Sequence, residues 1–152
     1  MNFEINEISD SLFLLGEIYL DGEIVQKDIN ILIYYYILAA NINNKKVQYK
    51  LAKLYKEGEY SLHYYNLAIN QNDSNALHDL GFIYFQGEFV PKDIEKAIHY
   101  FIFAANQNNS KSLYDLGVIY LSDKYNKKDV NKAIQFYTLS SDLNYADAQY
   151  NL

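Results

Sequence analysis

The sequence contains no cysteine and no tryptophan, and it has one proline and six glycines among its 152 residues. The absence of cysteine excludes disulfides and cysteine-ligated zinc or iron–sulfur sites, and it is typical of a reducing compartment. So little proline and glycine argues against an all-β protein, which needs many turns. The absences therefore point away from disulfide scaffolds, cysteine metal sites and β folds.

Basic residues are also scarce, because 13 Lys and Arg stand against 19 Asp and Glu, which gives a net charge of −6. A field of this sign repels nucleic acid and anionic membrane surfaces. The longest apolar stretch, residues 31–40, is too short to span a bilayer. The first ten residues contain no Lys or Arg ahead of an apolar run, so they do not form a signal peptide. We expect a cytoplasmic protein that neither binds nucleic acid nor inserts into a membrane.

What the sequence does contain is an internal repeat. A leucine followed by a small residue and, three positions later, by tyrosine occurs four times, with spacings of 36, 29 and 36 residues. The four pairs are Leu15-Gly16, Leu51-Ala52, Leu80-Gly81 and Leu116-Gly117. A second element recurs in step at 28–41, 93–106 and 129–142, and residues 61–70 keep the same phase. Self-similarity at this period indicates a solenoid.

The apolar residues within each repeat follow a helical period. One side of the first segment carries Ala76, Leu80, Ile83, Tyr84 and Gly87 at 100° per residue, and one side of the second carries Ile94, Ala97, Ile98, Phe101 and Ala105. Each repeat is therefore predicted to be two antiparallel helices joined by a short loop. Gly81 is predicted to let the second helix approach closely through its own Ala104-Ala105 pair.

Polar residues and glycines punctuate the predicted helices. We predict N-caps of the first helices at Ser9, Ser74 and Ser110, and N-caps of the second helices at Asp28, Asp93 and Asp129. Gly22, Gly58 and Gly87 are predicted to end the first helices. Asn43, Asn72, Asn108 and Asn144 are predicted to end the second helices, because Asn tolerates the left-handed conformation well.

These residues resemble a known family of repeats. The third repeat reads Ala76, Leu80-Gly81, Tyr84, Gly87, Val90, Asp93, Lys96-Ala97, Tyr100-Phe101 and Ala104-Ala105. The fourth keeps Tyr114, Leu116-Gly117, Tyr120, Asp129, Lys132-Ala133 and Phe136-Tyr137. The pattern is similar to the Sel-one-like repeat family, which is related to the tetratricopeptide repeats, and the resemblance covers residues 11–152.

The resemblance and the repeats together imply an all-α fold, a right-handed α-solenoid of tandem antiparallel helix-turn-helix repeats. We expect a single repeat domain over 1–152, with units at 11–46, 47–75, 76–111 and 112–147 and a partial unit from 148. The sequence departs from the family where its second loop glycine is replaced by Ile24, Phe89 or Tyr125. The second unit lacks seven residues, so its loop and the first turn of its second helix should be cut short.

Residues able to support catalysis do not form a recognisable pattern. His63 and His99 occupy equivalent positions about 10 Å apart, too far to share a zinc ion. No dyad or triad spacing surrounds His78, and Asp79 and Asp115 are expected to lie on solvent-facing turns. No glycine-rich phosphate loop is present. We therefore predict no catalytic, cofactor or metal site, and a protein that is not an enzyme.

The predicted function is binding of a protein partner in a groove. In the related tetratricopeptide geometry, the first helices line the concave wall of the solenoid. By position, the partner-binding groove is predicted to hold Glu17, Leu20, Lys53, Lys56, His78, Phe82, Phe85, Gln86, Val118 and Leu121. Four of these residues are apolar and belong to the third and fourth repeats, namely Phe82, Phe85, Val118 and Leu121. They are either exposed in the groove as a binding patch or buried between neighbouring units. Lys53 and Lys56 would favour an acidic segment.

A non-catalytic interaction scaffold or adaptor, binding a peptide or protein segment, is the resulting hypothesis. The family resemblance suggests adaptor roles in signalling, in protein quality control or in bacteria that interact with host cells. The alternative is a structural repeat protein that self-assembles. Residues 148–152 repeat the pattern of 76–80 and begin a further first helix, which is a cap, part of a longer array, or an apolar end that pairs with another copy. An enzyme would need a deep pocket with converging polar residues.

Overall fold

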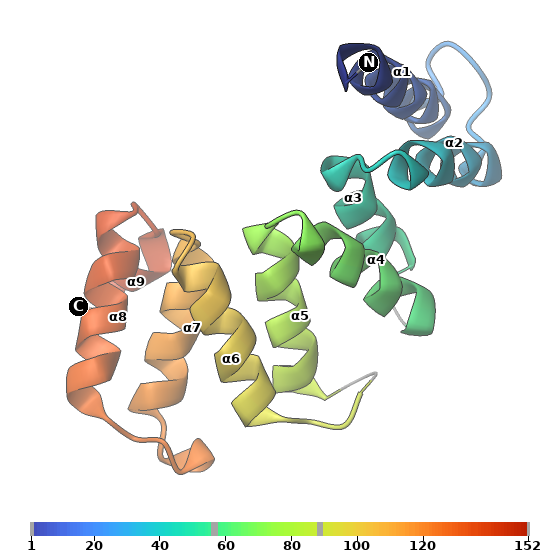
Figure 1. The fold of residues 1–152 in the computed structure, drawn as a ribbon. Coiled ribbons are helices and arrows are strands. Elements are labelled where there is room, and N and C mark those ends of the chain that lie inside the picture. Colours follow the sequence, from blue (N-terminus) through green and yellow to red (C-terminus); the bar gives the residue numbers. More distant parts are fainter. Residues whose placement is uncertain (1, 56–57, 88–89, 152) are drawn as a thin grey trace. The chain divides into compact units, whose positions relative to one another are not determined.

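The protein is described by a computed structural model that covers residues 2–55, 58–87 and 90–151, without the side chains of residues 2, 3 and 58–60. These residues form helices and no strand, as predicted (Figure 1). The helices are α1 (Asn2–Asp21), α2 (Ile29–Asn41), α3 (Lys45–Tyr55), α4 (Gly58–Asn70), α5 (Ser74–Gln86), α6 (Ile94–Ala105), α7 (Ser110–Leu121), α8 (Val130–Asp142) and α9 (Ala146–Tyr150), with a short 3-10 helix η1 (Asp123–Tyr125). None of the helices over these ranges is both long enough and apolar enough to cross a membrane.

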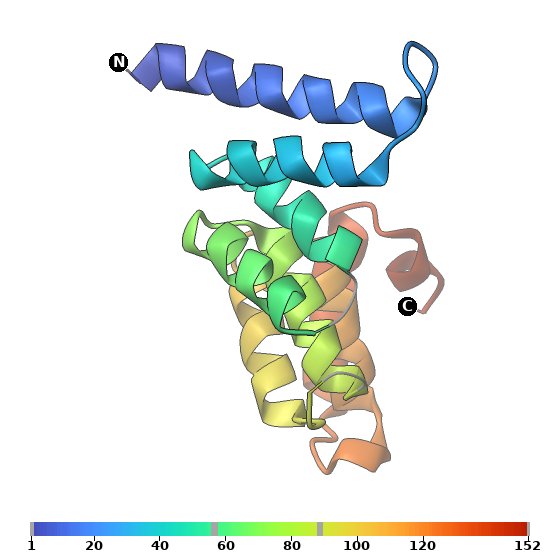
Figure 2. The same cartoon turned by 90° about the vertical axis from the view of Figure 1, so that its right-hand side faces the viewer.

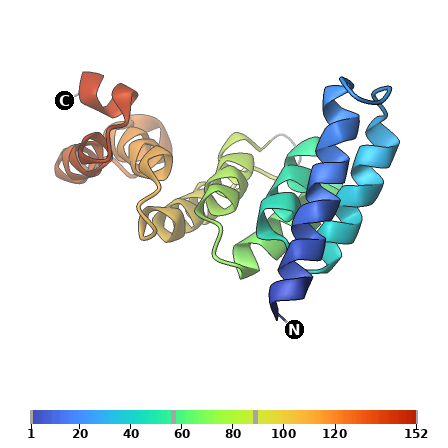
Figure 3. The ribbon, with the colours of Figure 1, turned by 90° about the horizontal axis from the view of Figure 1, so that it is seen from above.

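The chain divides into two compact units, Met1–Asn72 with α1–α4 and Asp73–Leu152 with α5–α9. In the first unit, α1 pairs with α2 and α3 pairs with α4. Figures 2 and 3 show α1 and α2 side by side and antiparallel. In the second unit, α5 to α8 lie side by side in chain order, and α9 contacts α8 (Figure 1). The predicted helix-turn-helix hairpins are thus present in both units.

The small residue of the repeat accommodates an aromatic ring. A Cβ atom added at Gly81 would lie 2.8 Å from the ring of Phe101, which is fully buried. Gly16 faces Tyr36 and Gly117 faces Tyr137 in the same way, at 2.7 Å each. The predicted close approach is confirmed. Its partner is the second aromatic residue of the pair rather than Ala104-Ala105, because the ring projects from α6 directly onto the glycine.

The helix starts confirm one set of predicted caps and correct the other. Asp28, Asp93 and Asp129 accept hydrogen bonds from backbone N–H groups of α2, α6 and α8, as predicted. In two of the first helices, the capping residue lies one position before the predicted serine. Asp73 caps α5 and Asn109 caps α7, so Ser74 and Ser110 are the first helical residues instead. Ser9 lies inside α1, which begins at Asn2.

The helix ends follow the predicted left-handed residues with one exception. Asn43, Asn72, Asn108 and Asn144 have φ between 57° and 64°, and Gly22 and Gly87 have φ of 74° and 76°. Gly58 does not end a helix, because α3 ends at Tyr55 and α4 begins at Gly58. Only residues 56 and 57 separate these two helices, and α4 keeps 13 residues. The first turn of the second helix is therefore kept. Five of the seven missing residues come from the connection between the two helices, and the other two come from α3, which ends three residues after Ala52, whereas α5 ends five residues after Gly81.

Candidate functional site

The predicted groove residues of the second unit lie on α5 and α7. His78, Phe82, Phe85 and Gln86 share one face of α5, and Val118 and Leu121 lie on α7; we call these six residues the α5–α7 face. The rings of His78, Phe82 and Phe85 form a row along α5. The ring centroids of His78 and Phe82 are 6.3 Å apart, and those of Phe82 and Phe85 are 6.1 Å apart. The row continues to Tyr125 in η1, at 5.4 Å from Phe85.

Exposure divides the α5–α7 face into two groups. Phe82 is 38% exposed and Leu121 is 47% exposed, and Gln86 is also exposed. Phe85 is half-buried against the core cluster of α6 and α7, and Val118 is half-buried against the cluster around Tyr137. Two of the four apolar residues are therefore exposed and two are half-buried, and their role in binding a partner stays a prediction. Phe82 and Leu121 offer apolar surface, while Phe85 and Val118 also serve the core.

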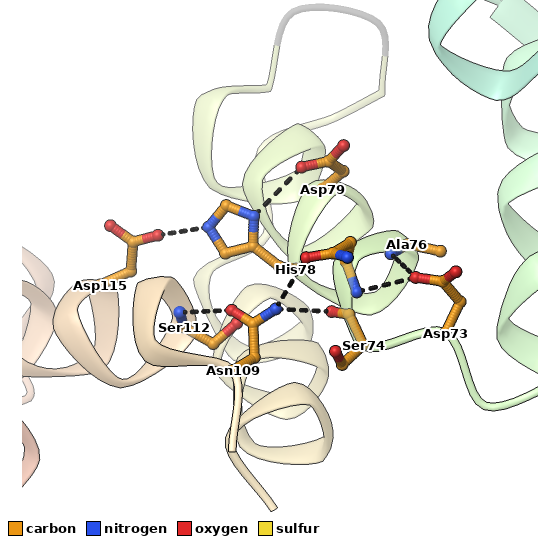
Figure 4. A network of polar contacts seen from close by, with 9 residues as sticks. Asp73, Ser74, Ala76, His78, Asp79, Asn109, Ser112 and Asp115 are labelled. Carbon is orange, nitrogen blue, oxygen red and sulfur yellow. Dashed lines mark hydrogen bonds and ion pairs between the residues drawn. The ribbon is translucent and has the colours of Figure 1, made fainter. Parts of the chain in front are cut away.

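His78 connects α5 to α7, which the sequence analysis did not predict. Its Nε2 atom lies 2.9 Å from Oδ2 of Asp115, and its Nδ1 atom lies 3.1 Å from Oδ1 of Asp79 (Figure 4). The prediction that Asp79 and Asp115 lie on solvent-facing turns is wrong, because both lie within helices and are half-buried beside His78. The reason is geometric, because α7 brings Asp115 to the ring of His78 from the neighbouring hairpin.

The two carboxylates determine the charge of the histidine. Burial alone would lower the pKa of His78, but its hydrogen bonds to Asp115 and Asp79 outweigh that effect and raise the pKa above its ordinary value. When both ring nitrogens carry protons, each donates to a carboxylate oxygen. The arrangement is therefore a clamp between two helices that favours the charged form of the histidine ring. Both ring nitrogens are occupied, so the ring is not available to act as a general base or metal ligand.

A second tie joins the starts of the same two helices. The side chain of Asn109 caps α7 by accepting a hydrogen bond from the N–H of Ser112 at 3.0 Å. Its Nδ2 atom donates to the carbonyl oxygen of Ser74, at the start of α5, at 3.2 Å (Figure 4). One side chain thus caps its own helix and binds the preceding first helix. The clamp and this tie hold α5 and α7 in a defined spacing.

The predicted groove residues of the first unit gather around a different feature. Leu20 and Lys53 line a pocket of about 270 Å³ between α1, α2 and α3, together with Leu32, Tyr36, Lys50 and Leu54; we call it the α1–α3 pocket. Lys56 lies outside the described residues.

Glu17 lies beside the α1–α3 pocket and is held by two partners. Both of its carboxylate oxygens accept hydrogen bonds from Nζ of Lys50 at 3.0 Å, and it also accepts one from the hydroxyl of Tyr36. Burial raises the pKa of Glu17, but the hydrogen bonds from Tyr36 and Lys50 outweigh this and lower it overall. Glu17 therefore stays ionised and positions Lys50.

The described residues were also compared with the requirements of a metal site. Across the part of the chain that the structure describes, no cluster of three or more His, Asp or Glu residues is arranged to hold a metal ion. What the sequence could have revealed is the clamp. Asp115 lies 37 positions after His78, one residue more than the repeat of 36, which places it opposite His78 on the next first helix.

Known proteins share this fold. A crystal structure of a Sel1 repeat protein from Oxalobacter formigenes superposes with a TM-score of 0.84 at 27% identity, over 95% of this chain and 62% of that one. Helicobacter pylori cysteine rich protein B gives a TM-score of 0.66 at 27% identity, over 86% of this chain and 99% of that one.

A third structure resembles the chain in fold alone. It is c5321, a protective antigen of uropathogenic Escherichia coli with an SLR fold, at a TM-score of 0.81 and 24% identity. It is matched over 95% of this chain and 32% of its own length, so this chain spans under two thirds of both c5321 and the Oxalobacter protein. No curated protein matches the chain in sequence.

The family model of the Sel1 repeat matches residues 9–44, 46–73, 74–109 and 110–145. These matches take in nearly all of the helical hairpins, including the α5–α7 face and the α1–α3 pocket. The chain therefore belongs to the Sel1 repeat family.

Proposed function

We propose that the chain is a non-catalytic interaction scaffold whose α5–α7 face binds an extended or helical segment of a protein partner. Sel1 repeat proteins are generally scaffolds that mediate protein–protein interaction. The finer assignment depends on one observation, the exposed Phe82 within a row of contacting rings on α5. Aromatic side chains in such positions are the usual anchors of protein interfaces.

The surroundings of Phe82 suit an anchor of this kind. The rings of His78 and Phe85 flank Phe82 on α5, and exposed Gln86 on the same face supplies a polar edge. Leu121 is a further exposed apolar residue, on α7. The clamp between His78 and Asp115 holds the two helices together, so little conformational freedom remains to be lost on binding. Extended peptides and amphipathic helices both bind through a few apolar anchors with polar flanks.

The proposal is tested by selecting a binding peptide from a displayed random library and measuring its affinity by fluorescence anisotropy. Phe82→Ala should weaken binding by about thirtyfold or more, the loss typical of a central aromatic anchor. Phe103→Ala is the matched control, because Phe103 is an exposed phenylalanine on α6, outside the α5–α7 face. Phe85→Ala is unsuitable alone, since Phe85 also packs against the core. Equal affinities for the two variants would contradict the proposal, provided that both have the helical content of the wild type.

A second candidate function is self-assembly through the C-terminal helices. Its support is a set of exposed apolar side chains on α8 and in the segment that follows it, including Ile134, Leu139 and Leu143, with Tyr150 exposed on α9. Sedimentation velocity over a wide range of protein concentration tests it. A monomer at every concentration would rule it out, whereas a dimer that Leu139→Ser dissociates would support it.

A further inference from the structure

The excess negative charge of the protein comes from its first helix and the loop that follows it. Residues 1–28 hold seven acidic residues and one basic residue, Lys27, whereas the other residues hold twelve of each sign. Helix α1 itself contains no basic residue. The net charge of −6 is therefore concentrated in this segment, which should attract a cationic ligand.

The same segment forms a groove with an apolar floor. Its volume is about 370 Å³, and its lining consists of three apolar and three acidic residues, Leu14, Ile18, Ile24, Glu17, Asp21 and Glu23; we call it the α1 groove. Leu14 is 59% exposed and Ile24 is 80% exposed. Ile24 stands where the repeat family has its second loop glycine, so this apolar side chain is a departure of the present chain from the repeat. Burial of such exposed apolar surface by a ligand is favourable.

Two of the three carboxylates of the α1 groove have no cation of their own. Glu17 is bound by Lys50 at 3.0 Å, so these two residues together contribute no net charge. Among the described residues, neither Asp21 nor Glu23 forms an ion pair or a side-chain hydrogen bond. Lys27 is the basic residue of the loop, and Asp28 in the same loop offsets its charge. Asp21 and Glu23 therefore leave the edge of the groove negative.

We propose that the α1 groove binds a basic peptide segment, with one apolar side chain against Leu14 and Ile24 and flanking lysine or arginine side chains facing Asp21 and Glu23. This is a second site, separate from the α5–α7 face, and it is independent of the function proposed for that face. The carboxylates select the sign of the partner and make binding sensitive to salt. The apolar floor makes a peptide a better ligand than a bare cation, which would leave Leu14 and Ile24 in water.

The test uses three synthetic peptides with the full chain, followed by ¹⁵N NMR titration. The probe is Lys-Lys-Leu-Lys-Lys, with blocked ends so that only side chains carry charge. One control replaces its leucine by alanine, and the other replaces its lysines by glutamates. We expect saturable shifts of the backbone amides of residues 14–24 with the probe, at a dissociation constant of about 1 mM. The alanine peptide should bind about threefold to tenfold more weakly, and the glutamate peptide should not bind saturably.

Variants of the protein localise the effect. Asp21→Lys should weaken binding of the probe by about fivefold to tenfold, because an attractive charge at the groove becomes repulsive. Asp142→Lys is the matched control, since Asp142 is the exposed last residue of α8 just as Asp21 is the exposed last residue of α1. It makes the same change in net charge and should alter affinity by less than about twofold. Ile24→Ser should reduce the difference between the leucine and alanine peptides.

Several outcomes would overturn the inference. These are no saturable binding of the probe up to about 5 mM, equal binding of the leucine and alanine peptides, shifts confined to the second unit, and equal effects of Asp21→Lys and Asp142→Lys. Spermine that shifts residues 14–24 with an affinity equal to that of the probe would assign the groove to a bare polycation instead. None of these results would affect the proposal for Phe82, whose test uses a different surface and a different ligand.

Discussion

The α5–α6 hairpin has an apolar interior, with Leu77 and Ala97 buried, whereas the equivalent positions of the α3–α4 hairpin hold Gln48 and Ser61. The polar pair is just as deeply buried, at 1% and 2% exposure. Both hairpins nevertheless pair their two helices in the same antiparallel way.

Both of these buried polar side chains have hydrogen-bond partners. The amide of Gln48 donates to the carbonyl oxygen of Ala40 at 2.9 Å and accepts from Gln71. The hydroxyl of Ser61 donates to the carbonyl oxygen of Ala52 at 2.9 Å. The comparison teaches that the repeat tolerates polar residues in its interior where nearby backbone or side-chain groups satisfy them.

The largest expected effect comes from exchanging the two interiors. Leu77→Gln removes a buried leucine and inserts an amide into an apolar environment, which should lower the free energy of unfolding by about 3 kcal/mol. Gln48→Leu, the reverse exchange, loses two hydrogen bonds but gains apolar burial, so it should cost about 1 kcal/mol. Urea unfolding followed by circular dichroism measures both. Equal costs would mean that the two interiors do not differ in the way described.

A second difference lies at the small residue, Gly81 in one hairpin and Ala52 in the other. Gly81→Ala should destabilise the protein by about 2 kcal/mol, because its Cβ would meet the buried ring of Phe101. That penalty exceeds the gain of about 1 kcal/mol that alanine brings in helix propensity. Ala52→Gly should cost about 1 kcal/mol through propensity alone.

The control for this pair is the double variant Gly81→Ala/Phe101→Leu. If the ring causes the penalty, adding Gly81→Ala to a Phe101→Leu background should cost much less than adding it to the wild type. A stabilising Gly81→Ala in the wild type would show that the ring adjusts at no cost.

The loops give a smaller effect. Asp93 caps α6 by accepting a hydrogen bond from the N–H of Lys96 at 2.9 Å. Asp93→Ala should cost about 1 kcal/mol, the usual value of an N-cap. Lys96→Ala is the control and should cost less than Asp93→Ala, because it leaves the cap in place and removes an exposed ion pair at 3.7 Å and a cation–π contact with Tyr84, 5.1 Å from the ring centroid. Similar losses for both would assign the effect to the ion pair.

The smallest expected effect on stability concerns His78 of α5. The equivalent positions of the repeat hold Tyr49 in α3 and Tyr114 in α7. Asp115 and Asp79 raise the pKa of His78 in the folded state, so its contribution to stability is fully present below the unfolded pKa of about 6.5. That contribution is lost as the pH rises through the higher folded pKa. Urea midpoints measured across this range should fall more in the wild type than in His78→Tyr. An NMR titration that gave His78 a folded pKa below 6.5 would contradict the clamp.

The two hairpins also show which features of the fold could be predicted from the sequence. The repeat, the helical period and the asparagines at the helix ends were all predictable, because each depends on residues close together in the chain. The caps of α5 and α7 were placed one residue late, since Asp73-Ser74 and Asn109-Ser110 offer two capping side chains in succession. Local sequence does not show which of the two side chains is the cap. In the folded protein the cap is the one that accepts hydrogen bonds from the first backbone N–H groups of the helix.

The candidate sites were predictable only in part. The positions of Phe82 and Leu121 on the first helices followed from the helical period, but their exposure did not, because Phe85 and Val118 follow the same period and pack against the core. The bond between His78 and Asp115 joins different hairpins. The period within one repeat does not indicate it, and only the comparison of successive repeats, in which Asp115 lies 37 positions after His78, could have suggested it.

The sequence by itself determined that this chain is an array of helical hairpins, because apolar spacing, small residues and caps act within one or two turns of a helix. Only the tertiary structure decided which side chains of neighbouring helices meet. It brought His78 to two aspartates, directed the ring of Phe101 onto Gly81 and gathered Leu20 with Lys53 around one pocket. The physical reason is that such contacts depend on the rotation and spacing of packed helices, which the whole set of buried side chains determines together.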